Sequence, residues 1–301
     1  MVSVIGASNI DITARPDAVY RPGDSNPGKV HVSFGGVGRN IAHDLRLLSV
    51  PVRFFTAFGG DAYAASLRQN CEELGMDLSC ALACPDEISS IYLAIHDEKG
   101  ELCAGVSDMN LVRRITKEYI VKNLPVLSQS DAVFFDTNLE EETMKTLVTS
   151  CSAPLYVDTV SCRKAGKLKR VLERGCHLFT LKANLVEAQT LSGGEIRSES
   201  DLADAAGLFH AWGVERVYIT LGKDGVFFSD GKTAKTLPSL AAKVVNATGA
   251  GDAFLSAVIL AGLSGGSAED AAKMGLMAAR LTLESENAVG ALSAEAIQIK
   301  E

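Results

Sequence analysis

The feature that most constrains the fold is the alternation of short apolar runs with longer amphipathic stretches along most of the chain. Seven apolar runs have the length of buried strands: 2–5, 52–57, 132–135, 155–157, 178–180, 216–220 and 225–229. Seven amphipathic stretches have helical periodicity: 38–48, 62–74, 140–150, 184–192, 199–212, 249–263 and 268–283. This pattern is typical of an α/β fold, in which helices cover both faces of a mostly parallel sheet.

Two regions interrupt the alternation. Residues 29–33 alternate like a half-buried strand, and residues 90–95 and 101–106 favour a hairpin around residues 97–100. These strands are too close together for strand–helix–strand units. We therefore expect a small separate β-sheet, built from segments at about 12–34 and 88–108, which acts as a lid over the active site of a single 1–301 domain.

Composition and charge exclude several classes of protein. The chain has 301 residues, 47% of them hydrophobic, and a net charge of −8. It lacks the basic surface of a nucleic-acid binder, and no apolar run is long enough to cross a membrane. The first residues do not form a signal peptide, and the seven cysteines are scattered. These observations predict a cytoplasmic protein with free thiols.

The strongest chemical motif runs from Asn246 to Asp252 (NATGAGD) and precedes an apolar helix. Its small residues permit a tight turn, after which the first helical amides converge on one point that suits a phosphate. An acidic residue there would repel the anion, but Asp252 could accept a proton from a hydroxyl that attacks the phosphate. The alternative is an ordinary acidic residue that stabilises a helix N-terminus.

A second motif, GGVGRNIA, begins at Gly35 and contains Gly36 and Asn40. It is not a dinucleotide fingerprint, because the third glycine position is isoleucine. Its glycines permit close approach of a ligand to the backbone. Asp11, soon after the first predicted strand, could accept hydrogen bonds from two neighbouring hydroxyls, although a turn residue is the alternative.

Two further segments have the character of helix and strand ends. Asn184 and Glu187 are three residues apart at a predicted helix start, as in a capping box. Residues 220–225 (TLGKDG) lie between two apolar runs, as in a hairpin turn. Neither segment on its own identifies a function.

In their order and spacing, the four segments resemble the ribokinase family of ATP-dependent kinases, over residues of about 5–287. The resemblance implies a three-layer fold with a β-sheet lid, a sugar or nucleoside substrate, and ATP with Mg²⁺. It implies that Asp252 is the catalytic base and that Gly249, Ala250 and Gly251 form the anion hole. The implied sugar ligands are Asn9, Asp11, Gly35, Gly36 and Asn40, and the implied ATP-binding residues are Asn184, Thr220, Gly222, Gly225 and Asn287. Glu187 would organise the magnesium ion through water.

The chain departs from the family pattern at two positions. Ala183 stands where the family usually has proline, and Asn246 stands where many relatives have aspartate. The second change removes a charge near the metal and the monovalent-cation region, so the role of an ion such as K⁺ is left open.

Within the family, residues 24–29, 108–110 and 158–161 and the asparagine at position 246 resemble pseudouridine kinases. That resemblance implies transfer of the ATP γ-phosphate to the 5′-hydroxyl of pseudouridine. It also implies that Ser25, Asn26, Asn110 and Lys164 are candidates for contact with the base, Ser25 and Asn26 only if the lid closes as in relatives. The alternatives are another ribose, fructose or nucleoside kinase, or a non-catalytic regulator with the same fold. An exposed edge of the lid sheet could pair two chains into a homodimer.

Overall fold

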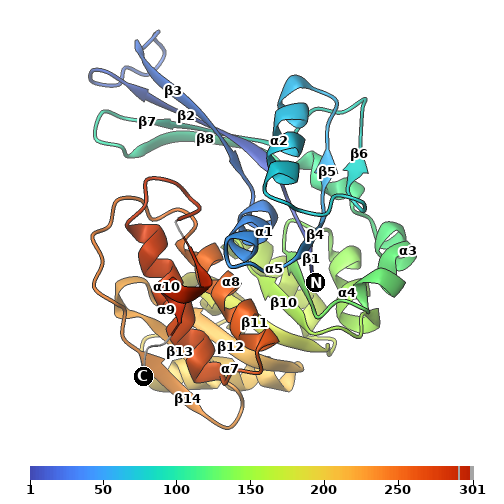
Figure 1. The fold of residues 1–301 in the computed structure, drawn as a ribbon. Helices are drawn as coiled ribbons and strands as arrows, with labels where there is room; N and C mark the ends of the chain where they lie inside the picture. Colours follow the sequence, from blue (N-terminus) through green and yellow to red (C-terminus); the bar gives the residue numbers. More distant parts are fainter. Residues whose placement is uncertain (291, 299–301) are drawn as a thin grey trace.

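The computed structural model describes residues 1–290 and 292–298, and it confirms the α/β prediction. The central sheet has eight strands in the order β14-β13-β12-β11-β10-β9-β1-β4 (Figure 1). The strands are β1 (Val2–Ile5), β4 (Val52–Phe55), β9 (Ala132–Asp136), β10 (Leu155–Asp158), β11 (Leu178–Asn184), β12 (Val214–Thr220), β13 (Val226–Ser229) and β14 (Ala234–Leu237). The strands from β4 to β12 are parallel, whereas β13 and β14 are added antiparallel at one edge.

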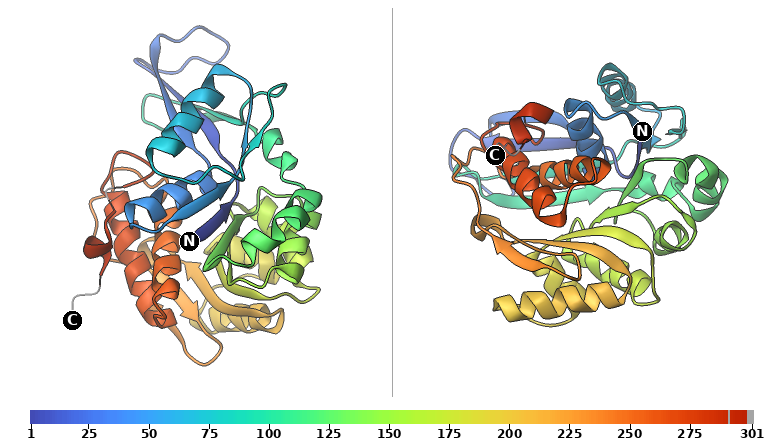
Figure 2. Two further views of the ribbon diagram at one scale, coloured as in Figure 1. Left: turned by 45° about the vertical axis from the view of Figure 1, so that its right-hand side comes forward. Right: turned by 60° about the horizontal axis from the view of Figure 1, so that its bottom comes forward.

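Helices cover both faces of this sheet and complete three layers (Figure 2). One face packs against α1 (Val37–Leu47), α8 (Ala250–Leu263) and α9 (Ala268–Leu283), with α2 (Ala62–Glu73) and α10 (Ala294–Ile297) at its margin. The other packs against α3 (Lys117–Leu127), α4 (Glu141–Ser150), α5 (Cys162–Leu172), α6 (Leu185–Ser192) and α7 (Glu199–Ala211). Because side chains alternate along a strand, Val4 joins the first core cluster and Ile5 the second.

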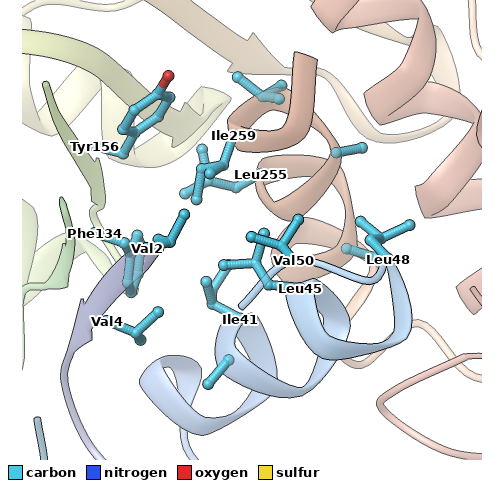
Figure 3. Close-up of a cluster of buried hydrophobic side chains, with 14 of the residues drawn as sticks. Val2, Val4, Ile41, Leu45, Leu48, Val50, Phe134, Tyr156, Leu255 and Ile259 are labelled. Carbon is cyan, nitrogen blue, oxygen red and sulfur yellow. The ribbon is translucent and has the colours of Figure 1, made fainter. Parts of the chain in front are cut away.

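The first core brings α1 and α8 side by side against the sheet (Figure 3). Ile41 and Leu45 of α1 and Leu255 and Ile259 of α8 are fully buried in this interface. Burying each such side chain stabilises the fold by roughly 1.5–3 kcal/mol. The apolar contact fixes the position of the N-terminus of α8 relative to α1.

A four-stranded sheet projects from one end of this body (Figure 1). Its order is β3-β2-β7-β8, with β2 (Asn9–Pro16), β3 (Gly28–Gly35), β7 (Ile91–His96) and β8 (Leu102–Asp108). The predicted hairpin is confirmed as the antiparallel pair β7–β8, and the predicted strand at 29–33 lies within β3. Below we call this unit the lid sheet. A separate two-stranded sheet joins β5 (Ala57–Phe58) to β6 (Leu82–Ala83).

Several elements differ from the sequence predictions. Helices α3 and α5 were not predicted, because the proline inside α3 and the basic residues of α5 weaken their patterns. Strands β2 and β14 were not predicted either. The predicted strand 52–57 ends at Phe55, and the chain then enters the two-stranded sheet. The predicted strand 225–229 begins at Val226, since Gly225 has a φ of 103°. Short 3₁₀ turns, η1 (Asn110–Arg114) and η2 (Gly222–Asp224), also appear.

Among the described residues, no helix is long and apolar enough to cross a membrane. All seven cysteines are free. The cytoplasmic location stays a prediction.

The packing of α8 on α9 yields a stability prediction. An added Cβ at Gly275 in α9 would lie 2.6 Å from ring carbons of Phe254, which is 1% exposed. We expect Gly275→Ala to lower the free energy of unfolding, because overpacking costs about 1–3 kcal/mol. This exceeds the roughly 0.5–1 kcal/mol that alanine gains over glycine in a helix.

The control is Gly207→Ala in α7, where an added Cβ meets nothing within 4 Å. This variant should be slightly more stable than the unmodified chain. Urea denaturation of both variants measures the difference. Equal stabilisation by the two substitutions would contradict the packing argument.

Candidate active site

Charged side chains gather where the central parallel strands end and α8 begins. Asp136 and Asp158 end β9 and β10, Lys182 lies near the end of β11, and Asp252 is in the first turn of α8. All four are buried. The carboxyl ends of parallel strands are where ligands bind in open α/β sheets, so this edge is the candidate active site.

Asp252 is the residue with the properties of a general base. Its Oδ2 accepts a hydrogen bond of 2.9 Å from Nδ2 of Asn40 on α1. Burial and, next, the charge of Asp158 raise the pKa of Asp252 to about 7, while Asn40 and Lys182 oppose this rise. A carboxylate with a pKa near neutrality suits proton transfer at physiological pH.

Lys182 supplies a positive charge beside the turn that precedes Asp252. Its Nζ forms an ion pair of 2.8 Å with Oδ2 of Asp158. Burial lowers the pKa of Lys182, but Asp158, Asp252 and Glu187 together raise it above its usual value, so the ammonium group stays charged. An added Cβ at Gly251 would lie 2.7 Å from this Nζ, so the ammonium lies against the backbone of the predicted anion hole. The sequence analysis did not identify Lys182.

The turn into α8 has the geometry that its small residues predicted. Gly249 is the N-cap with a φ of 83°, and an added Cβ would lie 1.7 Å from the carbonyl oxygen of Ala288. Asn246 donates from Nδ2 to the Glu286 carbonyl at 3.1 Å and accepts at Oδ1 from the Thr248 amide at 2.9 Å. Asn246 therefore joins the two loops that border this turn without contributing a charge.

The glycine motif packs against Asp11. An added Cβ at Gly35 would lie 2.0 Å from Oδ2 of Asp11, and one at Gly36, whose φ is 99°, would lie 2.4 Å from the Ala7 carbonyl oxygen. Oδ1 of Asp11 accepts a hydrogen bond of 2.6 Å from Nδ2 of Asn9. Burial raises the pKa of Asp11, and Asn9 and Arg39 oppose the rise. The structure thus brings Asn9, Asp11 and both glycines together.

Asp136 fastens this motif to the central sheet. Its Oδ2 accepts hydrogen bonds from the amides of Ala7 at 2.8 Å and Gly38 at 3.1 Å, and its Oδ1 accepts from the amide of Asn138 at 2.8 Å. Charge-assisted hydrogen bonds of this kind are about twice as strong as neutral ones. Asp136 therefore holds the N-terminus of α1 against β1, a role that the sequence analysis missed.

A cavity of about 740 Å³ opens between the lid sheet and the loops around α8. This volume is in the range of small-molecule sites. Its polar lining residues include Asp11, Thr13, His31, Ser33, Arg39, His43, Tyr92, His96, Asn246, Thr248, Glu286 and Asn287. The strand register gives Thr13, His31 and Tyr92 the same face of the lid sheet as Asp11. These three residues were not predicted as site residues, although their alternation with apolar residues along the strands was a sequence signal that could have identified them.

Arg39 connects this cavity to the base of the lid sheet. Its guanidinium donates to the Phe34 carbonyl at 3.0 Å and to Oδ1 of Asn70 at 2.6 Å. Burial and the charge of Arg39 lower the pKa of the neighbouring His43 to about 4, so that imidazole is neutral at physiological pH. Arg39 was not predicted as a site residue.

The predicted nucleotide residues lie at the ends of β11 and β12. Asn184 and Thr220 are register partners, and in the turn that leads to β13 Gly222 begins η2 and Gly225 follows it. Asn287 contributes to the lining of the cavity described above.

The capping box at the start of α6 is present. Glu187 accepts at Oε2 from the Asn184 amide at 2.9 Å and from Oγ1 of Thr159 at 2.5 Å. No group of three or more histidine, cysteine, aspartate or glutamate side chains among the described residues could hold a metal ion alone. Mg²⁺ usually keeps several waters and shares substrate phosphates, which fits a contribution of Glu187 through water. That role stays a prediction.

The residues predicted to contact the base do not gather at Asp11. Ser25 and Asn26 lie in the loop that begins after the register pair of Pro16 and Gly28. Pro16 is itself five residues along β2 from Asp11, which corresponds to roughly 17 Å. At the start of η1, Nδ2 of Asn110 donates a hydrogen bond of 2.9 Å to Oδ1 of Asp108. Lys164 on α5 donates to Oδ1 of Asn138 at 2.5 Å. Ser25 and Asn26 thus lie away from Asp11 in this structure, and their contact with the base, which requires a closed lid, stays a prediction.

Comparison with known proteins agrees with this geometry. The profile of the pfkB family carbohydrate kinases matches residues 1–295. This chain belongs to that family. As a pfkB-family kinase, it is an ATP-dependent sugar or nucleoside kinase.

Two curated relatives and one solved structure give the range of similarity. A pseudouridine kinase from Escherichia coli is 36% identical over 85% of this chain and 81% of its own length. A guanosine-inosine kinase from Exiguobacterium acetylicum is 27% identical over 99% of both chains. The crystal structure of ribokinase from Thermotoga maritima superposes with a TM-score of 0.86 at 25% identity, covering 99% of this chain and 97% of that one. The ribokinase-like fold is thereby confirmed.

The environment of Asp252 predicts a pH-dependent reaction. Protonated Asp252 cannot accept a proton, so kcat/KM of this kinase should fall as the pH drops through about 7. Asp252→Asn should lower kcat by about a hundredfold to ten-thousandfold and abolish this dependence. Steady-state kinetics across the pH range measure both effects.

The same substitution should stabilise the fold at neutral pH. Because the folded-state pKa of Asp252 is raised above 3.8, stability is lost as the pH rises from about 4 through about 7. The asparagine variant lacks this loss, so its melting temperature at neutral pH should be higher. Near-normal turnover of the variant would contradict the assignment of Asp252 as the base.

Proposed function

We propose that this kinase transfers the γ-phosphate of ATP to the 5′-hydroxyl of pseudouridine. The observation that carries the proposal is the 2.9 Å hydrogen bond between Asn40 and Asp252. It joins the glycine motif, which borders the cavity, to a base with a pKa near neutrality. The choice of pseudouridine is supported by the 36% identity to the Escherichia coli enzyme and by the resemblance around residues 24–29 and position 246.

In the proposed complex, the ribose is held by Asn9, Asp11, Asn40 and the backbone at Gly35 and Gly36. Asp11 can accept hydrogen bonds from two hydroxyls of the sugar. Asp252 takes the proton from the 5′-hydroxyl as its oxygen attacks the phosphate. The substrate therefore lies between the lid sheet and the first turn of α8.

The amides of Gly249, Ala250 and Gly251 bind the phosphoryl group as negative charge develops in the transition state. Lys182, whose Nζ lies against Gly251, adds a positive charge at the same point. Fixed donors of this kind need no rearrangement during the reaction, which is why they stabilise the transition state more than water does.

ATP is proposed to lie along the ends of β11 and β12, in contact with Asn184, Thr220, Gly222, Gly225 and Asn287. An apolar groove of about 630 Å³ beside this turn is lined by Leu237, Leu240, Leu276 and Met277, which suits the adenine ring. Ser239 donates a hydrogen bond to the Lys223 carbonyl and so holds the groove against η2. Mg²⁺, organised through Glu187 and water, would neutralise charge on the phosphates. A requirement for a monovalent cation such as K⁺ stays a prediction.

Selection of the base is proposed to occur on the lid sheet. Pseudouridine has a free ring N1–H, where uridine has only C–H. Thr13, His31 and Tyr92 carry acceptor atoms and line the cavity. They are nearer to Asp11 than Ser25 and Asn26 are, whereas Asn110 and Lys164 hydrogen-bond to neighbouring side chains.

A purine nucleoside is the second candidate substrate, because the guanosine-inosine kinase matches 99% of the chain. A ribose or fructose substrate would leave the polar lid face unused. A non-catalytic regulator is disfavoured by the paired Asn40 and Asp252 and by the complete turn at 249–251.

Competition between pseudouridine and uridine tests the proposal. At equal, subsaturating concentrations, pseudouridine should be phosphorylated about ten- to a hundredfold faster, since uridine leaves one buried acceptor unpaired. A panel with guanosine, inosine, ribose and fructose completes the comparison. If any of these has a higher kcat/KM than pseudouridine, the substrate assignment is wrong, whereas the family membership stands.

Asp11→Ala is the control for this competition. The loss of a charged acceptor should raise KM for both nucleosides by a similar factor and leave KM for ATP nearly unchanged. The preference for pseudouridine should therefore persist in the variant. Loss of the preference in this variant would indicate that Asp11, and not the lid face, selects the base.

A homodimer is proposed to form through the outer face of the lid sheet. Val30, Val32 and Val106 are 67%, 45% and 64% exposed, and the strand register gives them the same face as Ile12 and Leu93. An apolar sheet face of this kind is normally covered, and a second copy offers the same surface. We expect the double variant Val30→Glu and Val106→Glu to sediment as a monomer and the unmodified chain as a dimer. A monomeric unmodified chain would contradict the proposal.

A further inference from the structure

The interface between α1 and α8 contains a polar cluster of which the proposed mechanism uses only Asn40. Four of its atoms are buried without a hydrogen-bond partner among the described residues: Oδ1 of Asn40, both carboxyl oxygens of Asp44, and Oγ of Ser256. Asp44 and Ser256 are 0% exposed. The interface around them is apolar, with Ile41 and Leu45 facing Leu255 and Ile259 (Figure 3).

The cluster lies one helical turn behind the catalytic pair. Asn40 and Asp44 are four residues apart on α1, and Asp252 and Ser256 are four residues apart on α8, so each pair shares a helix face. The Asp252 carboxylate lies close enough to Asp44 to raise its pKa, and the Ser256 hydroxyl lies close enough to lower it. The two helices therefore bring a second carboxyl group close to the proposed base.

The orientation of the Asn40 amide requires a donor on the other side. Its Nδ2 donates to Asp252, so its Oδ1 faces away from that carboxylate and needs a donor of its own. If the Asn40 amide were flipped, its oxygen would face the Asp252 carboxylate, and two hydrogen-bond acceptors would be in contact. An ionised Asp44 has no hydrogen to donate, whereas a protonated Asp44 has one.

We propose that Asp44 is held protonated and acts as a positioning residue, donating a hydrogen bond that fixes Asn40 and, through Asn40, the carboxylate of Asp252. Asp44 itself touches neither substrate nor the transferred phosphate. Its hydrogen is the donor that the buried Asn40 oxygen otherwise lacks.

The surrounding charges favour this distribution of protons. Asp252 on α8 faces Asp44 from across the interface, and Arg39 lies on the same helix as Asp44. His43, also on α1, is neutral, and Asp136 of β9 is bound to the amides of Ala7 and Gly38. Burial and, next, the charge of Asp252 raise the pKa of Asp44 well above its usual value. Asp252 accepts the Asn40 hydrogen bond and lies near Lys182, and both lower its pKa. Of the two carboxyl groups, Asp252 is therefore the one that ionises first.

A purely structural role explains Asp44 poorly. A buried carboxyl group without a geometrically formed hydrogen bond destabilises a fold, and an aliphatic side chain would suit the surrounding interface better. Removal of the carboxyl group should therefore preserve or raise stability while it impairs catalysis. A residue that served stability alone would show the opposite result.

The test compares Asp44→Asn, which keeps a donor, with Asp44→Leu, which does not. Asp44→Asn should retain nearly the wild-type kcat and pH profile. Asp44→Leu should lower kcat about tenfold to a hundredfold, the effect of one unpaired buried group. KM for the nucleoside should rise, because Asn40 also contacts the ribose, whereas KM for ATP should change little. The acidic limb of this variant should move to higher pH, because a loosened Asn40 no longer lowers the pKa of Asp252. Its melting temperature should be unchanged or higher.

Infrared difference spectroscopy tests the protonation state without any turnover. The wild-type spectrum minus that of Asp44→Asn should show the carbonyl band of a protonated carboxylic acid at neutral and mildly alkaline pH. A carboxylate band in its place would overturn the proposal. This readout separates the inference from the proposed function, on which the kinetic arm rests, because it remains valid even if pseudouridine is not the substrate.

The matched control is Thr180→Val, which removes a buried hydroxyl without a hydrogen-bond partner among the described residues in the middle of β11. It should leave the pH profile unchanged. If Asp44→Leu does not fold, Asp44→Ala takes its place and should give the same kinetic pattern. Wild-type kinetics in the folded Asp44→Leu or Asp44→Ala variant, or equal damage by Asp44→Asn, would overturn the proposal.

Discussion

The hydrogen bond between Asn40 and Asp252 is the contact on which the site depends. It joins residues 212 positions apart in the chain, and it exists only because α1 and α8 pack together on one face of the central sheet. The apolar contacts of Ile41 and Leu255 set the distance between the helices, and the polar groups at their ends then meet. In this kinase the hydrophobic core therefore determines the geometry of the proton acceptor.

Electrostatic balance is the second constraint. Asp136, Asp158 and Asp252 are buried near one another, and burial of three carboxylates is unfavourable unless each is compensated. Asp136 has backbone amides, Asp158 has Lys182, and Asp252 has one hydrogen bond from Asn40. Burial and, next, the charge of Asp158 raise the pKa of Asp252 to about 7, and the Asn40 hydrogen bond and Lys182 offset this rise only in part, so Asp252 can exchange a proton. The property that suits catalysis is also a local cost in stability.

The lid sheet presents two chemically different faces because successive side chains of a strand point in opposite directions. Asp11, Thr13 and Tyr92 share the face that borders the cavity. Val30, Val32 and Val106 share the other face and are largely exposed. A shift of one residue in register would exchange the two faces, so the pairing of Asp11 with Ser33 matters for both proposed roles.

The sequence by itself determined the elements whose cause is local. Strand and helix alternation follows from hydrophobic periodicity, and the turns at Gly36 and Gly249 follow from backbone angles that favour glycine. The motifs containing Asp11, Asn40, Asn184 and Asp252 were recognisable for the same reason. Only the tertiary structure decided what these residues contact. Lys182 and Asp44 acquire their proposed roles from partners on other elements, and Ser25 and Asn26 lie far from Asp11 along the hairpin, because burial and charge pairing depend on segments distant in the chain.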